Sequence, residues 1–204
     1  MSSQTAYAGT GATGAIGGIG TGGVAWSNPG NITSSDNSYA TVDLSNTNTS
    51  AQALVATNFS FSLPLHSSIN GVIATFERKA SAADTIRDSH IYLVHDNTLL
   101  GSNKIAAPAY WSTTEGSVSF GGPADTWGAS LTQPIIESSS FGVLTDAIWQ
   151  NVYSGTETAY VDSVSITVYY TVNYWSKFGS TSIGKIYYGS TQVAKVYYGS
   201  TRVA

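Results

Sequence analysis

One long run of alternating side chains constrains the fold more than any other feature of the sequence. Between Ser163 and Trp175 the even-numbered positions carry valine, isoleucine or tyrosine, and most odd-numbered positions carry serine, threonine or asparagine. Because successive side chains of a β-strand point to opposite faces of a sheet, this pattern predicts a half-buried strand. A single strand through the whole segment would be about 40 Å long at ~3.3 Å per residue, so we expect part of it to leave the body of the protein.

Shorter alternating segments, separated by turn residues, predict more strands between residues 24 and 175. Residues 59–63 and 72–76 are expected to pair about a hairpin turn at Asn70-Gly71. Residues 89–95 predict a strand that ends at Asp96-Asn97, residues 76–88 predict strand, loop and strand, and residues 145–153 could form a turn or two of helix. Together these patterns predict an all-β fold, an antiparallel β-sandwich or jelly roll, for residues 25–175.

Residues 1–24 consist mainly of glycine, alanine, threonine and serine, with isolated isoleucines. Because the segment has few large side chains to bury, it gains little free energy against the conformational entropy lost when the chain becomes ordered. We therefore expect a flexible or extended arm. The segment matches the pattern G-x-G-x-x-G at Gly9 and again at Gly18. Neither match has the preceding strand, the following helix and the later acidic residue that a dinucleotide site requires, so we expect no nucleotide cofactor there.

A ten-residue repeat occupies the C-terminal segment, residues 176–204, as FGSTSIGKIY, YGSTQVAKVY and YGSTRVA. It predicts a small antiparallel meander that turns at Gly-Ser-Thr and has too few strands to be stable alone in water. We therefore expect a homo-oligomer, with a trimer as the first hypothesis. The residues assigned to this oligomer or docking interface are Lys185, Tyr187, Tyr188, Lys195, Tyr197 and Tyr198.

The composition excludes several functions. The chain has no cysteine, only 10% charged residues and a net charge of −4, and it has no dense patch of lysine and arginine, so nucleic-acid binding is disfavoured. No apolar run is long enough to span a membrane and no secretory signal is recognisable, so we expect a chain made in a cytoplasm and no membrane insertion. No Lys or Arg precedes Arg78 and no acid follows Asp162, so a basic tail is joined to an acidic body.

No enzyme motif is recognisable, and we expect neither catalytic residues, nor a bound metal, nor a cofactor. His90 and His95 would point to opposite faces of one strand, whereas Asp88 and His90 would share a face, where a hydrogen-bonded surface pair is expected rather than a metal site. His66 is expected in a turn, with no neighbouring acid.

Aromatic residues are the other candidates for a binding site. The residues that could stack on sugar rings are Tyr110, Trp111, Trp127, Trp149 and Trp175, with Tyr110, Trp111 and Trp127 as the site candidates. The alternative is that these side chains pack in the core, as tryptophan commonly does.

Several segments, in order and spacing, resemble a family of structural proteins from tailed bacteriophages and prophages. They are AWSNPGN from Ala25, DNSYATV from Asp36, INGVIATFERKASA, DSHIYLV, DTWG from Asp125, FGV from Phe141 and AYVDSVSITVYYT. The repeated K-[IV]-Y-Y-G-S-T-x-V is similar to short repeats of phage tail-associated proteins. This resemblance implies a non-catalytic β-sandwich component of the virion, exposed on the particle, and carries over no functional residue.

Three functions remain open. The first is a structural protein on a phage surface, decorating the capsid or forming part of a fibre or tail, whose partners are further copies of itself and other virion proteins. The second is a lectin-like adhesin that binds host surface glycans through an aromatic patch. The third, hydrolysis of a host polysaccharide, would need two carboxylates ~5 to 9.5 Å apart in a cleft.

Overall fold

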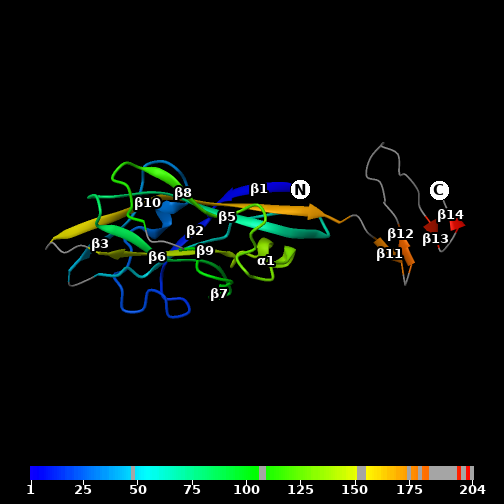
Figure 1. The fold of residues 1–204 in the computed structure, drawn as a ribbon, viewed down its shortest axis with the longest axis horizontal. Helices are drawn as coiled ribbons and strands as arrows, with labels where there is room; N and C mark the ends of the chain where they lie inside the picture. Colours follow the sequence, from blue (N-terminus) through cyan, green and yellow to red (C-terminus); the bar gives the residue numbers. More distant parts are fainter. Residues whose placement is uncertain are drawn as a thin grey trace.

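The computed structural model describes residues 1–46, 49–105, 109–150 and 155–173, together with the backbone of 176–178, 181–183, 197–198 and 201–202. Nearly all regular structure is antiparallel β, in two five-stranded sheets (Figure 1). The first sheet consists of β1 (Ser2–Tyr7), β3 (Ala40–Ser45), β5 (Ser67–Ala80), β8 (Gly116–Gly121) and β10 (Thr156–Val172). The second consists of β2 (Thr10–Gly14), β4 (Ala53–Thr57), β6 (Ile86–His95), β7 (Thr98–Leu100) and β9 (Gly142–Trp149).

The order of the strands is that of a jelly roll. In a jelly roll, one long antiparallel ribbon of eight strands is wound up, so the first strand pairs with the last, the second with the seventh, and so on inward. Here β3 pairs with β10, β4 with β9, β5 with β8 and β6 with β7. The additional pairs β5–β10 and β6–β9 join the ribbon into two sheets. The all-β sandwich expected from the sequence is confirmed.

β10 is the longest strand and links three others of its sheet. Thr156 to Val161 pair with β3, Ser165 to Tyr170 pair with β1, and almost the full length pairs with β5 on the other side. The alternation expected for this segment is present, since Val164, Ile166 and Val168 are fully buried. β10 is long because β3 and β1 pair with it one after the other along the same edge.

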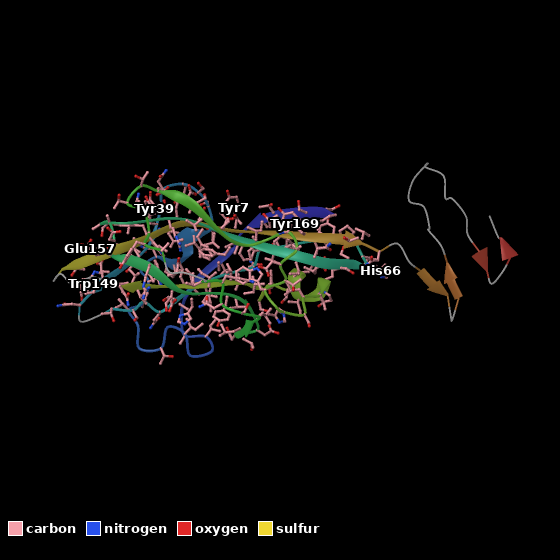
Figure 2. All side chains as sticks on the ribbon, viewed as in Figure 1. Tyr7, Tyr39, His66, Trp149, Glu157 and Tyr169 are labelled. Atoms are coloured by element: carbon pink, nitrogen blue, oxygen red, sulfur yellow. The ribbon has the colours of Figure 1, made fainter. Side chains whose placement is uncertain are left out.

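The hydrophobic core fills the space between the two sheets, where Figure 2 shows closely spaced side chains. Its largest fully buried members are Trp127, Phe76, Phe141, Ile32, Leu44, Leu54, Ile86, Ile91, Leu93, Ile136, Leu144 and Ile166. The other small elements are the 3₁₀ turn η1 (Pro29–Ile32) and the short helix α1 (Gln133–Glu137), each of which places one isoleucine in this buried set. Among the described residues, no helix is long and apolar enough to cross a membrane.

The two sheets differ on their outer faces. A second apolar cluster lies outside the second sheet, where Ile16 and Ile19 of the loop after β2 pack on Val55, Val94 and neighbouring side chains. The first sheet instead presents hydroxyl pairs between strands, such as Thr5 with Thr167 and Thr75 with Ser119. The second sheet is therefore covered on both faces, at least in part.

A flexible or extended arm was expected over residues 1–24, and the flexible alternative is wrong for its first part, which forms β1 and β2. β1 pairs with β10, and β2 pairs with β4, so the first residues extend both sheets. The glycines serve close packing here: a Cβ on Gly11 would lie 1.9 Å from the carbonyl oxygen of Pro29, and one on Gly9 would lie 2.5 Å from that of Asn58. A segment poor in large side chains is thus ordered by backbone hydrogen bonds and contact with a core built by other strands.

Three further local predictions are also corrected. β5 runs straight through Asn70-Gly71, where the register with β10 shifts, and a Cβ on Gly71 would lie 2.3 Å from the carbonyl oxygen of Gly122. The predicted strand at residues 59–63 is irregular, because Asn58 and Ser60 have positive φ values that turn Phe59 and its alternating neighbours into the core. Residues 145–149 of the segment that could form a helix are instead part of β9, and residues 151–153 lie outside the described residues. The predicted strand, loop and strand over 76–88 and the strand ending at His95 are confirmed.

The C-terminal repeats form short antiparallel pairs. β11 (Ser176–Phe178) pairs with β12 (Thr181–Ile183), and β13 (Tyr197–Tyr198) pairs with β14 (Thr201–Arg202). The turns were expected at residues 189–191 and 199–201; residues 189–191 and 199–200 lie outside the described residues, and Thr201 belongs to β14. The middle repeat, residues 188–197, lies outside the described residues except for Tyr197.

Candidate functional site

A bulge in β6 determines where its charged residues point. The register between β6 and β9 shifts between Asp88 and His90, so Ser89 is an extra residue in the strand. Asp88 then faces the interior, whereas His90 faces away from it. The expectation that the two side chains share a face is wrong, because one added residue reverses the alternation of a strand.

Asp88 forms a buried ion pair with Arg78 of β5, across the space between the sheets. Both guanidinium Nη atoms donate to the carboxylate, with Nη2 2.6 Å from Oδ2, and Thr145 Oγ1 donates to Oδ1 at 3.2 Å. The ring of Trp111 lies over the guanidinium, with its centroid 4.3 Å from Cζ. Arg78 Nε has no hydrogen-bond partner among the described residues, so the arginine is fixed by the carboxylate and by the indole.

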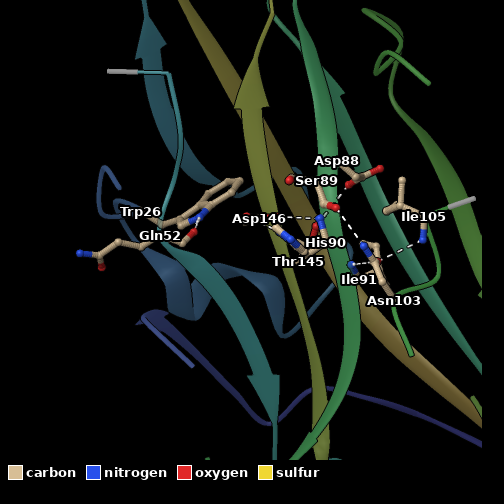
Figure 3. A network of polar contacts seen from close by, with 10 residues as sticks. All are labelled: Trp26, Gln52, Asp88, Ser89, His90, Ile91, Asn103, Ile105, Thr145 and Asp146. Atoms are coloured by element: carbon tan, nitrogen blue, oxygen red, sulfur yellow. Dashed lines mark hydrogen bonds and ion pairs between the residues drawn. The ribbon is translucent and has the colours of Figure 1, made fainter. Parts of the chain in front are cut away.

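On the other face of β6, His90 pairs with Asp146 of β9 (Figure 3). The backbone N–H of His90 donates to Oδ1 at 2.7 Å, and the ring Nδ1 lies 2.9 Å from Oδ2. Burial raises the pKa of Asp146, and the hydrogen bond and charge of His90 offset part of that rise. The His90 side chain is 37% exposed, so this pair meets solvent on the imidazole side. The ring contact of this imidazole is therefore with the Asp146 carboxylate, through Nδ1.

A third group of ionisable residues combines three carboxylates on the outer side of the first sheet. Oxygen atoms of Glu77, Glu115 and Asp162 lie within 4.8 Å of one another, a donor set of the kind that Ca²⁺ and Mg²⁺ prefer. Burial, and then the charges of neighbouring carboxylates, raise the pKa of Asp162. Lys79 Nζ lies 3.2 Å from Glu115 Oε2, and Ser163 Oγ donates to Glu77 Oε2 at 3.0 Å. Two of the three carboxylates are therefore already paired with side chains of the protein.

The aromatic candidates separate into core and surface residues. Trp127 is fully buried and its Nε1 donates to the Val72 carbonyl oxygen at 2.9 Å, so it is a core residue. Trp149 is also buried, and its Nε1 has no partner among the described residues. Tyr110 and Trp111 are adjacent in the chain and line one pocket, in which Trp111 is a buried wall and Tyr110 is 45% exposed. Trp175 lies outside the described residues.

That pocket has a volume of about 400 Å³ and opens beside β8. It is lined by Arg78, Ala109, Tyr110, Trp111, Ser112, Thr114, Glu115, Gly116, Ser117 and Val118. Its size falls within the range of about 300–1,000 Å³ that is common for small-ligand sites.

The predicted interface residues of the tail cannot be placed in a site. Lys185, Tyr187, Tyr188 and Lys195 lie outside the described residues, and only the backbone of Tyr197 and Tyr198 is described, in β13. His66 lies in a turn with a positive φ, as the sequence indicates.

Sequence reasoning missed the partners of both pairs on β6, namely Arg78 and Asp146. Asp146 stands in a segment interpreted as a possible helix, and a carboxylate within the mostly apolar sequence GVLTDAIW was the available signal. A scan of the chain against protein-family models and a search of curated proteins found no match.

Proposed function

We propose that this chain is a non-enzymatic structural protein on the surface of a tailed-phage virion, where it decorates the capsid or forms part of a fibre or tail. Its jelly-roll body supports this proposal at the level of fold, because viral capsid proteins often use this architecture, although lectins use it as well. The segment resemblance to phage structural proteins points in the same direction.

The observation that carries the proposal is the pairing in the tail. The pairs β11–β12 and β13–β14 belong to neither sheet of the body. Isolated two-stranded pairs are marginal in water, and a row of them leaves unpaired edges. Association with the same segment of other copies would cover those edges, and the repeat would then serve as the assembly element.

Solution mass tests this proposal. Light scattering of the full chain should give an oligomer, with a trimer as the first hypothesis, and a chain ending at Trp175 should give a folded monomer. The truncated chain retains every strand of the two sheets, so its circular dichroism should show an intact β fold. A monomer in both cases would contradict assembly through the tail.

Position on the particle needs a separate experiment. Mass spectrometry of purified particles from the phage or prophage that encodes the chain should detect it, and gold-labelled antibody should place it on the head or the tail. Substituting Lys177, Lys185, Lys195 and Arg202 together by glutamine should weaken attachment at low salt, if the basic tail docks on an acidic lattice. Particles without the chain would contradict the proposal.

A further inference from the structure

We propose that the pocket beside β8 binds a neutral sugar ring, with Tyr110 as its stacking platform. This inference concerns a ligand of the body, and it does not depend on assembly through the tail or on a place in a virion. It gives the adhesin alternative a defined site. The stacking residue is Tyr110 alone, because Trp111 is a buried wall of the pocket and Trp127 lies in the core.

The pocket is built on a fixed frame. The backbone N–H of Trp111 donates to the Ile86 carbonyl oxygen at 2.8 Å, and the N–H of Ala80 donates to the Ser112 carbonyl oxygen at 2.9 Å. The loop is thereby attached to β6 of one sheet and to β5 of the other. The hydroxyl of Tyr110 also donates to the Gln150 carbonyl oxygen at 3.3 Å, which limits the orientations of its ring. A stacking surface is therefore present before any ligand arrives.

Exposed apolar side chains gather at this site. Five large hydrophobic side chains are exposed among the described residues, and two of them, Tyr110 at 45% and Val118 at 41%, line this pocket. A pyranose ring has an apolar face of C–H groups that packs on an aromatic ring in this way. The other three, Met1, Tyr7 and Leu65, do not line the pocket.

The polar lining fits the hydroxyl groups at the edge of a sugar. Ser112, Thr114 and Ser117 offer hydroxyls, of which Ser112 Oγ already accepts from the Thr114 N–H. Glu115 offers carboxylate oxygens that accept, of which Oε2 already accepts from the Tyr39 hydroxyl. Sugar hydroxyls are themselves both donors and acceptors, so this set can satisfy them without a metal ion.

The charges of the pocket favour a neutral ligand over an anionic one. Arg78, the one cation in the lining, has its charge compensated by Asp88, and both Nη atoms are engaged with that carboxylate. Glu115 contributes negative charge at the wall, although Lys79 lies 3.2 Å from it. A sialic acid or uronic acid would bring its carboxylate to Glu115 without a free cation, which costs binding energy.

The test uses the full-length chain and a defined set of sugars. Saturation-transfer NMR with millimolar methyl glycosides of glucose, galactose, mannose and N-acetylglucosamine should detect binding of at least one of them. N-acetylneuraminic acid and glucuronic acid should bind more weakly than that glycoside. A glycan array then shows whether the bound sugar ring belongs to an isolated monosaccharide or to a longer glycan chain of the host type.

Three variants locate the binding. Tyr110→Ala should weaken the affinity by about tenfold or more, the level typical of a central contact residue. Tyr110→Phe should keep most of the affinity, because the ring remains. Tyr7→Ala removes a tyrosine that is 53% exposed on β1 and outside the pocket, so it is the matched control and should bind as the unmodified chain does.

The proposal is overturned if no neutral glycoside binds, if only the acidic sugars bind, or if Tyr110→Ala and Tyr7→Ala have equal effects. Thermal unfolding of each variant, which should be within a few degrees of the unmodified chain, separates lost binding from lost folding. The tail is intact in every variant. The oligomeric state of each variant, measured in parallel, therefore tests assembly through the tail separately from sugar binding at the pocket.

Discussion

β6 carries two acid–base pairs on opposite faces, and they differ in their surroundings more than in their chemistry. Asp88 meets Arg78 between the sheets, where both side chains are 5% exposed, whereas Asp146 meets a half-exposed His90 outside the second sheet. In the interior each charge depends on the other, because water cannot replace a lost partner. On the outer face, water can replace part of the contact between His90 and Asp146, because the imidazole is partly exposed. Similar contacts should therefore contribute differently to stability.

The largest effect is expected for Asp88→Ala. The substitution leaves the Arg78 guanidinium and the Thr145 hydroxyl without their shared acceptor in a buried site. The free energy of unfolding should fall by about 3–5 kcal/mol, as is typical when one member of a buried pair is removed. Urea unfolding at constant protein concentration measures this change, and a loss below about 1 kcal/mol would show that water reaches the arginine.

Replacing both members is the control for that variant. The double substitution Arg78→Met and Asp88→Leu removes both charges and fills the site with apolar side chains. Its stability loss should be much smaller than that of Asp88→Ala, because no charge is left unpaired. Equal losses would indicate that packing around Trp111, and not the unpaired charge, causes the effect.

A smaller effect is expected for Thr145→Val. The side chain is fully buried, and its hydroxyl donates to Asp88 Oδ1 at 3.2 Å. Valine has nearly the same shape, so the loss should be about 1.5–3 kcal/mol, the contribution of one hydrogen bond to a charged group. Thermal or urea unfolding measures it, and in the Arg78→Met, Asp88→Leu background the same substitution should cost almost nothing.

The smallest effect at neutral pH is expected for Asp146→Asn. The carboxylate of this pair is 6% exposed, but the His90 side chain is 37% exposed, so water screens the contact and it contributes about 0–1 kcal/mol. Its signature is the pH dependence: burial raises the pKa of Asp146 above its ordinary value of 3.8, so the folded protein holds this proton more tightly than the unfolded chain does. The stability of the unmodified protein relative to the variant should therefore fall as the pH rises above 3.8.

Unfolding curves of both proteins at a series of pH values from acid to neutral measure that difference. His90→Gln keeps the carboxylate, so it should retain the fall with increasing pH. A relative stability that rises with pH would contradict the inferred burial of Asp146.

The alternating strands and the all-β class could be predicted, because their signal lies in near neighbours along the chain. β10 shows this: its buried valines and isoleucine follow the alternation of the sequence. The N-terminal strands could not be predicted, because Thr10–Gly14 has almost no side-chain pattern and is ordered by pairing with β4, far away in the sequence. Asn70-Gly71 has the residues of a hairpin turn, but its partner strand and the approach of Gly122 keep the chain extended.

The candidate sites show the same division. Tyr110 and Trp111 were recognisable as adjacent aromatics, but only the fold separates an exposed ring from a buried wall and places Trp127 in the core. The pairs of β6 could not be read from spacing, because the extra residue at Ser89 reverses the faces. A bulge has no fixed sequence pattern when it contains no glycine.

The sequence by itself determined the all-β class, the alternating core of the long strand and the presence of a repeat in the tail, since each depends on periodicity within a short window. The tertiary structure decided that the glycine-rich start belongs to both sheets, that Arg78 meets Asp88 and His90 meets Asp146, and that Tyr110 stands at the rim of a pocket. The physical reason is that pairing register and burial are set by strands distant in the chain, and one extra residue or one close backbone contact reverses what local alternation indicates.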